Sequence, residues 1–341
     1  MYKIAIAGAS TLLGKELKDA IADSPLAAAN LMLLDEEDAQ GQLDQVGDEI
    51  AIVQSIEADS FDHVDFTFFC GTPELTLKHW RAALRAGSSV LDLSGALDQE
   101  SGVLTGAPWL ATGTASPDLF TPAIAPAHPA ALSLALALDR LQSVAPIRSA
   151  AATVLLPASE FGQKAMDELH QQTINLLSFQ SMPREIFDAQ TAFNLILGLG
   201  ESAKASLSAV EARIRRNVAA LTGVKLPALA LQVVQAPVFH GLTFSIAVEL
   251  HQPAELAAIE DAFGGEHLDL VLEDTDSPSN LSATGQDDVL VRLRPELESE
   301  AKGMVRRLWL WAAADNLRLN AQNALACAMD LRRLRPQGSV Q

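Results

Sequence analysis

Short apolar runs alternate with amphipathic segments in the first third of the chain. Five of these runs have the length and composition of buried strands: Tyr2–Ala7, Asn30–Leu34, Ile50–Val53, Phe66–Cys70 and Ser89–Leu93. Between them, Leu12–Ile21 and Glu74–Ala86 carry apolar residues at helical spacing. Strand–helix–strand repetition of this kind predicts an α/β fold with a doubly wound parallel sheet and helices on both faces.

The pattern changes in the second half of the chain. Longer strand candidates occupy Arg148–Leu156, Leu229–Val238, Leu242–Leu250, Val289–Leu293 and Met304–Ala312, with helices predicted at Phe161–Leu177 and Leu207–Leu221. Long strands with few helices between them predict a second, α+β domain with a mixed sheet. The last helix, Leu317–Leu334, has the amphipathic pattern of a cap on the first domain. We therefore predict one domain from residues 1–128 and 317–341, and another from residues 129–316.

Two glycines bracket the turn between the first strand and the first helix. The turn reads Gly8, Ala9, Ser10, Thr11, Leu12, Leu13 and Gly14. Glycine permits a positive φ and close backbone approach, and N–H groups at the start of a helix can face a pyrophosphate. A simple strand–helix turn explains the same spacing, so both interpretations stay open on spacing alone.

An acidic residue at the end of the second strand extends the nucleotide hypothesis. Asp35 lies 21 residues after Gly14, where a carboxylate can accept hydrogen bonds from a ribose diol. A carboxylate at this place repels a 2′-phosphate, so NAD(H) is favoured over NADP(H). The alternative is that residues 35–38 form a solvated acidic loop.

Charge and composition narrow the classes of partner. Lys and Arg number 24 against 43 Asp and Glu, a net charge of −19 that repels nucleic acid and anionic lipid. The apolar stretches are too short to cross a membrane, and the N-terminal run is too short for a signal peptide. The two cysteines, Cys70 and Cys327, cannot build a disulfide framework and fit a reducing cytoplasm. The histidines have no metal-ligand spacing, so we expect no metal site.

Several stretches resemble the aspartate-semialdehyde dehydrogenase family. They are Ile4–Gly14, Phe61–Leu97, Ala158–Leu177, Val233–Glu249 and the run Asp315, Asn316, Leu317 and Arg318. The resemblance implies a Rossmann domain closed by the C-terminal helix, and a central domain that carries the catalytic groups and the dimer sheet. It also implies NAD or NADP as cofactor, Asn316 near the nicotinamide, a homodimer, and a place in or near amino-acid biosynthesis.

The chain departs from that family where the chemistry is done. The family's reaction needs a nucleophilic cysteine, a histidine base, and arginines for the anionic groups of the substrate. The positions that match the family's catalytic and binding residues hold Asp98, His128, Leu156, Gln235 and Leu242. His128 stands in the place of the cysteine, so the resemblance implies the scaffold without its nucleophile.

Two hypotheses follow from this loss. The first is a pseudo-enzyme that retains the dimer and the NAD site, or the dimer alone, as a homodimer or paired with an active relative. The second is an NAD(P)-dependent oxidoreductase on an aldehyde-type substrate, with altered acid/base residues. His128 is its first candidate and His240, two residues before Leu242, is the weaker one. We expect Cys70 and Cys327 to be packing residues.

Overall fold

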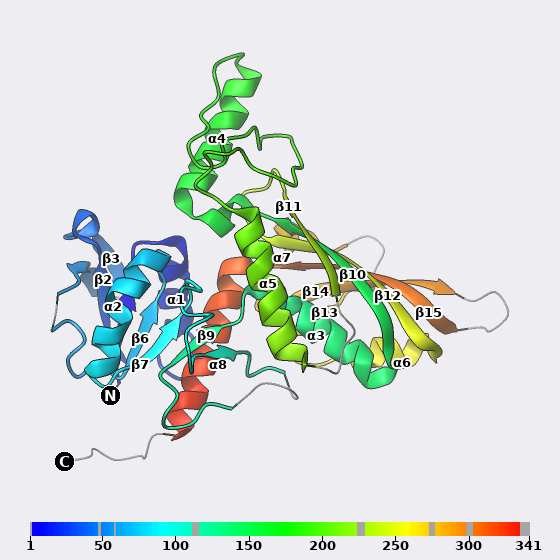
Figure 1. The fold of residues 1–341 in the computed structure, drawn as a ribbon, viewed down its shortest axis with the longest axis horizontal. Helices are drawn as coiled ribbons and strands as arrows, with labels where there is room; N and C mark the ends of the chain where they lie inside the picture. Colours follow the sequence, from blue (N-terminus) through cyan, green and yellow to red (C-terminus); the bar gives the residue numbers. More distant parts are fainter. Residues whose placement is uncertain are drawn as a thin grey trace. The chain divides into compact units, whose positions relative to one another are not determined.

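A computed structural model describes residues 2–46, 49–57, 59–110, 116–223, 229–272, 277–297 and 303–334. The chain forms two compact units (Figure 1). Unit 1 comprises Met1–His128 and Asn320–Gln341, and unit 2 comprises Pro129–Leu319. Unit 2 thus runs three residues past the predicted boundary at residue 316. The backbone N–H groups of Leu317 and Arg318 bond the carboxylate of Asp315, which holds this first helical turn to unit 2.

Unit 1 is built on a seven-stranded sheet in which every neighbouring pair is parallel. Its order is β5 (Gln54–Ser55), β2 (Asn30–Asp35), β1 (Lys3–Ala7), β6 (Phe66–Phe69), β7 (Ser89–Asp92), β9 (Ala123–Pro126) and β8 (Leu104–Gly106). This confirms the predicted doubly wound sheet. The strand predicted at Ile50–Val53 is instead β4 (Glu49–Ile52), which pairs with β3 (Leu43–Val46) in a separate antiparallel hairpin.

Helices cover both faces of this sheet because side chains alternate along each strand. Ile4 and Ile6 of β1 pack in one core with α1 (Leu12–Ala22) and the C-terminal helix α8 (Asn316–Leu334). Ala5 and Ala7 point to the other face, into a core that includes Leu75 and Trp80 of α2 (Pro73–Arg85). A short 3₁₀ helix, η1 (Glu37–Ala39), follows β2.

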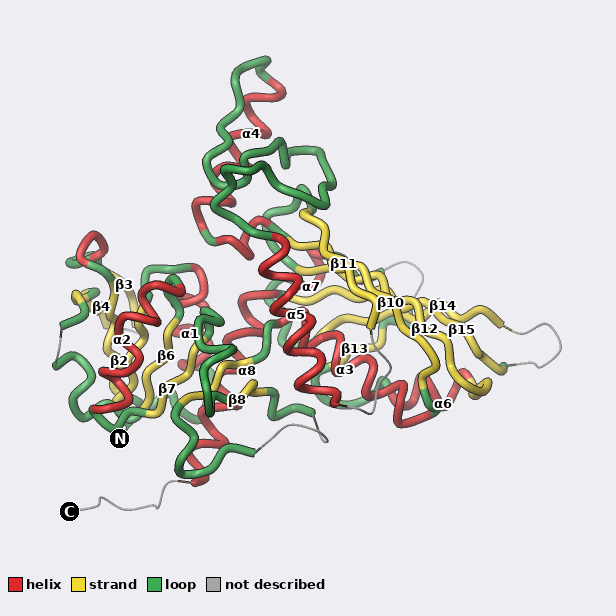
Figure 2. Tube along the Cα trace, in the orientation of Figure 1, coloured by secondary structure: helices red, strands yellow, loops and turns green. Residues whose placement is uncertain are grey.

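Unit 2 carries a six-stranded mixed sheet (Figure 2). Its order is β11 (Leu229–Gln235), β10 (Ile147–Leu156), β12 (Leu242–Glu255), β15 (Met304–Ala314), β14 (Val289–Leu297) and β13 (Leu268–Leu270). The pairs β10–β11 and β13–β14 are parallel and the others antiparallel. The predicted mixed sheet is confirmed.

The helices of unit 2 lie between or beside these strands. They are α3 (Pro129–Val144), η2 (Ala158–Phe161), α4 (Gln163–Leu177), α5 (Leu207–Thr222), α6 (Leu256–Ala262) and α7 (Asn280–Ala283). Helix α3 has no counterpart in the sequence analysis, because it is apolar on nearly every face and therefore lacks an amphipathic stripe. The helix predicted at Phe161–Leu177 begins at Gln163, since Gly162 adopts a φ of 84° and interrupts it.

Helix α4 anchors the long connection that follows it. The buried side chain of Gln172 accepts hydrogen bonds from the backbone N–H groups of Thr191 and Ala192, and donates to backbone carbonyls of Pro183 and Ala189. Glu168, one turn earlier, accepts from the N–H groups of Ile186 and Phe187. These two buried side chains therefore serve the fold, by pairing backbone groups of a segment without regular structure.

Candidate functional site

The glycine loop of unit 1 is sterically fixed at both of its ends. Gly8 has a φ of 89°, and a Cβ there would overlap the backbone of Gly71 and lie 2.8 Å from the carbonyl carbon of Cys70. A Cβ on Gly14 would overlap the carbonyl oxygen of Gly8. Strand, loop and helix therefore approach as closely as a dinucleotide-binding turn requires.

Most polar groups within this loop are paired inside the protein. The N–H groups of Gly8 and Ala9 bond the carbonyl of Leu34, and Thr11 caps α1 by accepting from the N–H of Gly14 at 3.0 Å. The Thr11 hydroxyl donates to the carbonyl of Gly8, so this side chain turns into the loop. The N–H groups of Leu12 and Leu13, in the first turn of α1, have no acceptor within the helix. They are the donors that fit a pyrophosphate.

Asp35 closes the loop from the end of β2. Its carboxylate accepts from the N–H of Ser10 at 2.9 Å and from its neighbour Glu36 at 2.9 Å. A carboxylate has about four acceptor positions, so these two bonds leave room for a ribose diol. The Ser10 hydroxyl is buried and has no hydrogen-bond partner among the described residues.

A hollow of about 410 Å³ lies beside Asp35. It is lined by Asp35, Glu36, Glu37, Ile56, Lys78 and His79. Burial, and then the charge of Lys78, lowers the pKa of His79, which favours the neutral imidazole. The hollow, the two glycines and the first-turn N–H groups together fit the adenosine half of a dinucleotide.

Both cysteines of unit 1, which we expected to be packing residues, and the candidate base His128 are buried. Cys70 and Cys327 are 4% and 1% exposed, and desolvation raises the pKa of each thiol far above its ordinary value. His128 is 1% exposed. Both thiols therefore stay protonated and pack as small apolar side chains, Cys327 against Gly106 and Ile124.

Three segments of unit 2 meet where the neighbouring strands β10, β12 and β15 begin or end. Ser159 follows the end of β10, His240 precedes β12, and Asp315 follows β15. The pairings Leu155 with Thr243 and Leu242 with Ala314 bring these strand ends side by side. Ring atom Nδ1 of His240 lies 3.0 Å from the Ser159 hydroxyl, and Nε2 lies 2.8 Å from a carboxylate oxygen of Asp315.

Asp315 is held as an ionised carboxylate. It accepts from the N–H groups of Leu317 and Arg318 with one oxygen and from Gly285 with the other. Burial alone would raise the pKa of Asp315, but hydrogen bonds from His240 and these backbone groups outweigh it and lower the pKa. The side chain thus caps α8 and orients the imidazole at the same time.

Asn316 completes this cluster from within unit 2. Its amide oxygen accepts from the Ser159 hydroxyl at 3.2 Å and from the N–H of Gly241 at 3.3 Å. The bond from Gly241 fixes the orientation of the amide, because the NH₂ group could not accept it. The amide nitrogen has no partner among the residues that the structure describes. The expected role of Asn316 near a nicotinamide stays a prediction.

Three of the positions that the resemblance predicts for catalytic and binding residues hold apolar or internally bonded groups. Leu156 and Leu242 are fully buried. Gln235 is also fully buried, with its amide nitrogen bonded to the carbonyls of Leu156 and Ala236. Its amide oxygen has no partner among the described residues. Within the described ranges, no three His, Cys, Asp or Glu side chains gather as metal ligands, and no helix is long and apolar enough to span a membrane.

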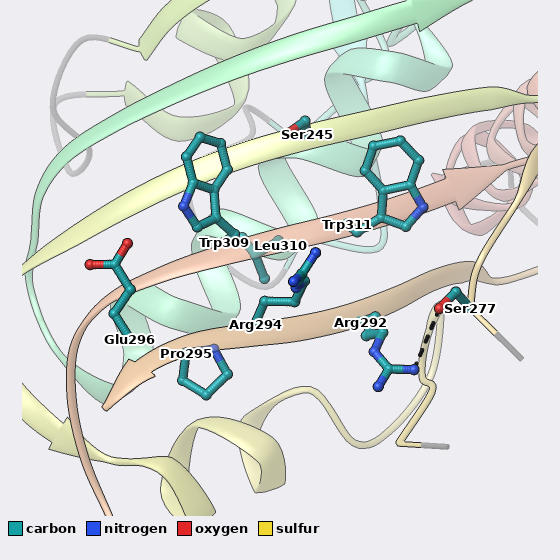
Figure 3. A pocket seen from close by; sticks show the side chains of 9 residues that line it. All are labelled: Ser245, Ser277, Arg292, Arg294, Pro295, Glu296, Trp309, Leu310 and Trp311. Carbon is teal, nitrogen blue, oxygen red and sulfur yellow. Dashed lines mark hydrogen bonds between the residues drawn. The ribbon is translucent and has the colours of Figure 1, made fainter. Parts of the chain in front are cut away.

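The second face of the unit 2 sheet, here called the tryptophan face, carries the short helix α7 at one end, where Ala283 packs with Leu290 and Ala313. Helices α3, α5 and α6 pack on the face that buries Leu308 and Leu310. The opposite face presents Trp309, 47% exposed, and Trp311. Figure 3 shows the two indole rings standing on the same side of β15. Together with side chains from β12 and β14 they line a hollow of about 730 Å³.

The side chains of the tryptophan face lie in rows across β12, β15 and β14. Trp309 lies between Ala247 and Arg294, and Trp311 lies between Ser245 and Arg292. The Trp311 ring nitrogen donates to the carbonyl of Pro278 at 2.7 Å. Rigid aromatic and arginine side chains of this kind are typical of protein–protein interfaces.

These two units define the class of protein. Family models of semialdehyde dehydrogenases match the chain over residues 3–116, as the NAD binding domain, and residues 138–319, as the dimerisation domain. The chain belongs to this family, and the resemblance to aspartate-semialdehyde dehydrogenases is confirmed.

Relatives of the chain carry two kinds of name. The chain is 31% identical over 337 residues to a USG-1 protein homolog of Azotobacter vinelandii, covering 95% of this chain and 96% of the relative. It is 24% identical over 335 residues to the aspartate-semialdehyde dehydrogenase of Rickettsia bellii, with 97% of each covered. A solved probable aspartate-semialdehyde dehydrogenase from Pseudomonas aeruginosa superposes with a TM-score of 0.84 at 28% identity, covering 97% of this chain and 98% of that one.

The unit 2 cluster is only partly predictable from the sequence. His240 is a candidate base there, whereas Ser159 and Asp315 have no predicted chemistry. The three residues are far apart in the chain, and no local motif links them. Only the strand register of β10, β12 and β15 brings them together.

Proposed function

We propose that this chain is a homodimeric, NAD(H)-binding member of the aspartate-semialdehyde dehydrogenase family that does not catalyse that dehydrogenation. The observation that carries the proposal is the burial of both thiols in unit 1. The family's reaction needs a thiolate, and Cys70 and Cys327 are sealed in the core with raised pKa values. Loss of a catalytic nucleophile costs roughly 10⁶ in turnover.

The nucleotide half of the proposal rests on the loop and on Asp35. The first-turn N–H groups of Leu12 and Leu13 would hold the pyrophosphate, and the Asp35 carboxylate would bond the ribose diol. Bound NAD⁺ or NADH supplies a hydride acceptor or donor. Carboxylates at the hollow repel an additional phosphate, which supports NAD(H) over NADP(H).

The dimer half rests on the tryptophan face of unit 2. Covering the exposed indole of Trp309 on that face removes apolar surface from water. A second copy offers the same surface, and a two-fold contact pairs like with like. The same face would also receive a related active chain in a heteromer.

Ligand titration and an activity assay test the proposal together. We expect NADH to raise the melting temperature, with a stabilisation of about 2.7 kcal/mol at a hundredfold excess over Kd. NADPH should need about tenfold more ligand, and Asp35→Asn should remove that preference while Asp62→Asn, an exposed acid of the same unit, should keep it. Aspartate semialdehyde with phosphate should give no turnover. Ordinary dehydrogenase rates would refute the proposed lack of that activity. If no nucleotide shifts the melting temperature, NAD(H) binding is refuted and only the dimer remains of the proposal.

The second candidate function is an oxidoreductase with altered acid/base residues. The hydrogen bonds from His240 to Asp315 and Ser159 favour it, because an imidazole oriented by a carboxylate is a suitable general base. Nicotinamide turnover on an aldehyde panel that is lost in His240→Gln would support this function over the first. Loss in His128→Ala instead would assign the role to the histidine at the cysteine position.

A further inference from the structure

The Ser159, His240 and Asp315 cluster has the connectivity of a hydrolytic triad. The hydroxyl contacts one ring nitrogen at 3.0 Å and the carboxylate contacts the other at 2.8 Å. These distances fall in the range in which a histidine takes a proton from a serine hydroxyl. Triads are recognised by such geometry and roles rather than by residue order in the chain.

Asp315 fixes the tautomer that this chemistry needs. Its carboxylate only accepts, so the proton of a neutral His240 stays on Nε2 and Nδ1 is left as an acceptor. The Ser159 hydroxyl then has two acceptors in reach, Nδ1 at 3.0 Å and the Asn316 amide oxygen at 3.2 Å. Rotation of the hydroxyl toward Nδ1 gives the arrangement of an activated nucleophile.

Asn316 adds a donor beside the nucleophile. Its amide oxygen is held by Gly241, and its NH₂ group donates to no described residue although the side chain is only 2% exposed. An amide donor that bonds no protein group can stabilise an oxygen that gains negative charge. Nucleophile, base, orienting carboxylate and oxyanion donor thus lie together within unit 2.

We propose that Ser159 is an acyl-accepting nucleophile at this cluster, which hydrolyses small uncharged esters without using a nicotinamide. The Ser159 oxygen attacks the ester carbonyl while its proton passes to Nδ1 of His240. The bond to the leaving alcohol breaks, and the alcohol takes that proton from His240. Water, deprotonated by the same imidazole, then attacks the acyl-serine ester and releases the carboxylic acid, leaving Ser159 as it began. The strongly acidic chain disfavours anionic esters at this site.

A fluorophosphonate probe on the full-length protein tests the proposal. We expect one covalent adduct per chain, located on Ser159 by peptide mass spectrometry, and slow hydrolysis of p-nitrophenyl acetate. Ser159→Ala should abolish the adduct, and His240→Gln should lower the labelling rate at least about 100-fold. Ser133→Ala is the matched control, since Ser133 is also 3% exposed but bonds only a backbone carbonyl. Melting temperatures of each variant separate lost reactivity from lost folding.

A thiol substitution gives a positive readout. Ser159→Cys should react with iodoacetamide at least about tenfold faster than Ser133→Cys, because an adjacent imidazole favours the thiolate. The natural cysteines are buried and contribute little background. Equal rates for the two variants, or a fluorophosphonate adduct that survives Ser159→Ala, would overturn the proposal. NADH binding to the wild-type protein is measured separately, so failure of this proposal is distinct from failure of the proposed cofactor site.

Discussion

The two units use their polar side chains in different ways. In unit 1, Thr11, Asp35 and Asp92 all bond backbone groups of nearby turns. In unit 2, Ser159, His240 and Asp315 bond one another through side chains from three separate segments. The polar side chains of unit 1 fix the shape of a loop. Those of unit 2 gather where the strands β10, β12 and β15 begin or end.

The difference between the units shows that the fold and the reaction place different requirements on the residues. The dinucleotide turn depends on backbone shape, which Gly8 and Gly14 fix by their close approach to neighbouring backbone. Reactivity depends on side chains that face one another, and His128, which the resemblance predicts at the family's cysteine position, is buried in unit 1. A family fold can therefore persist in unit 1 while the candidate chemistry lies in unit 2.

The largest expected effect tests the rigidity of the unit 1 loop. Gly8→Ala forces a Cβ into the backbone of Gly71, at a φ of 89° that alanine disfavours. We expect the free energy of unfolding to fall by more than about 4 kcal/mol, which denaturant unfolding followed by circular dichroism would measure.

Gly41→Ala is the control for this loop. Gly41 has a φ of 82°, but nothing lies within 4 Å of the added Cβ, so the cost should be about 1 to 2 kcal/mol from backbone strain alone. Similar losses in both variants would mean that close packing at Gly8 does not hold the loop, and the contrast between the units would weaken.

Much of the fold was predictable because periodicity and strand length are local signals. The parallel strands of unit 1 and the long strands of unit 2 follow from runs of apolar residues. Helix α3 escaped prediction because burial on all sides removes the amphipathic pattern. The hairpin of β3 and β4 escaped because pairing partners cannot be deduced from one short apolar run.

The candidate site was predictable only where it is local. The spacing of Gly8, Gly14 and Asp35 could be deduced from consecutive segments, and the structure brings these residues together in one loop. The bond from Ser10 to Asp35 could not, because a side-chain rotamer decides it. The triad-like cluster depends on strand register over more than 150 residues, which no spacing rule encodes.

The second expected effect is weaker dimerisation through the tryptophan face of unit 2. Trp309→Arg places a cation beside Arg294 and removes an exposed indole from the centre of the proposed interface. We expect the dimer dissociation constant to rise about 30-fold or more, a loss of about 2 kcal/mol or more, measured by sedimentation velocity over a concentration series.

Phe120 of unit 1 provides the control for that interface. It is 91% exposed, so Phe120→Arg makes the same kind of change away from the sheet. The dimer should be unaffected. If both variants dissociate equally, or if neither does, the sheet face is not the contact and the assigned role of unit 2 in dimerisation would need another surface.

The smallest expected effect tests whether the unit 2 cluster is a charged network. The pKa of Asp315 lies below its ordinary value of 3.8, so the unfolded chain binds the proton more readily than the folded one. The stabilisation is therefore fully present above the unfolded pKa and is lost as the pH falls through the folded pKa. Asp315→Asn keeps an acceptor for the cap of α8 but removes the charge, and should cost about 1 to 2 kcal/mol at pH 7.

The pH dependence is the sharper measurement of the two. Unfolding free energies of wild type and Asp315→Asn should converge as the pH falls below 3.8 and through the lowered pKa of Asp315, because the wild-type carboxylate then becomes neutral. Asp330→Asn, which breaks a more exposed pair with Arg333 in α8, should change stability by less than about 0.5 kcal/mol at pH 7. A gap between wild type and Asp315→Asn that stays constant across this range would show that Asp315 acts through packing alone. The imidazole of His240 would then lack the ionised partner that its proposed role as a base requires.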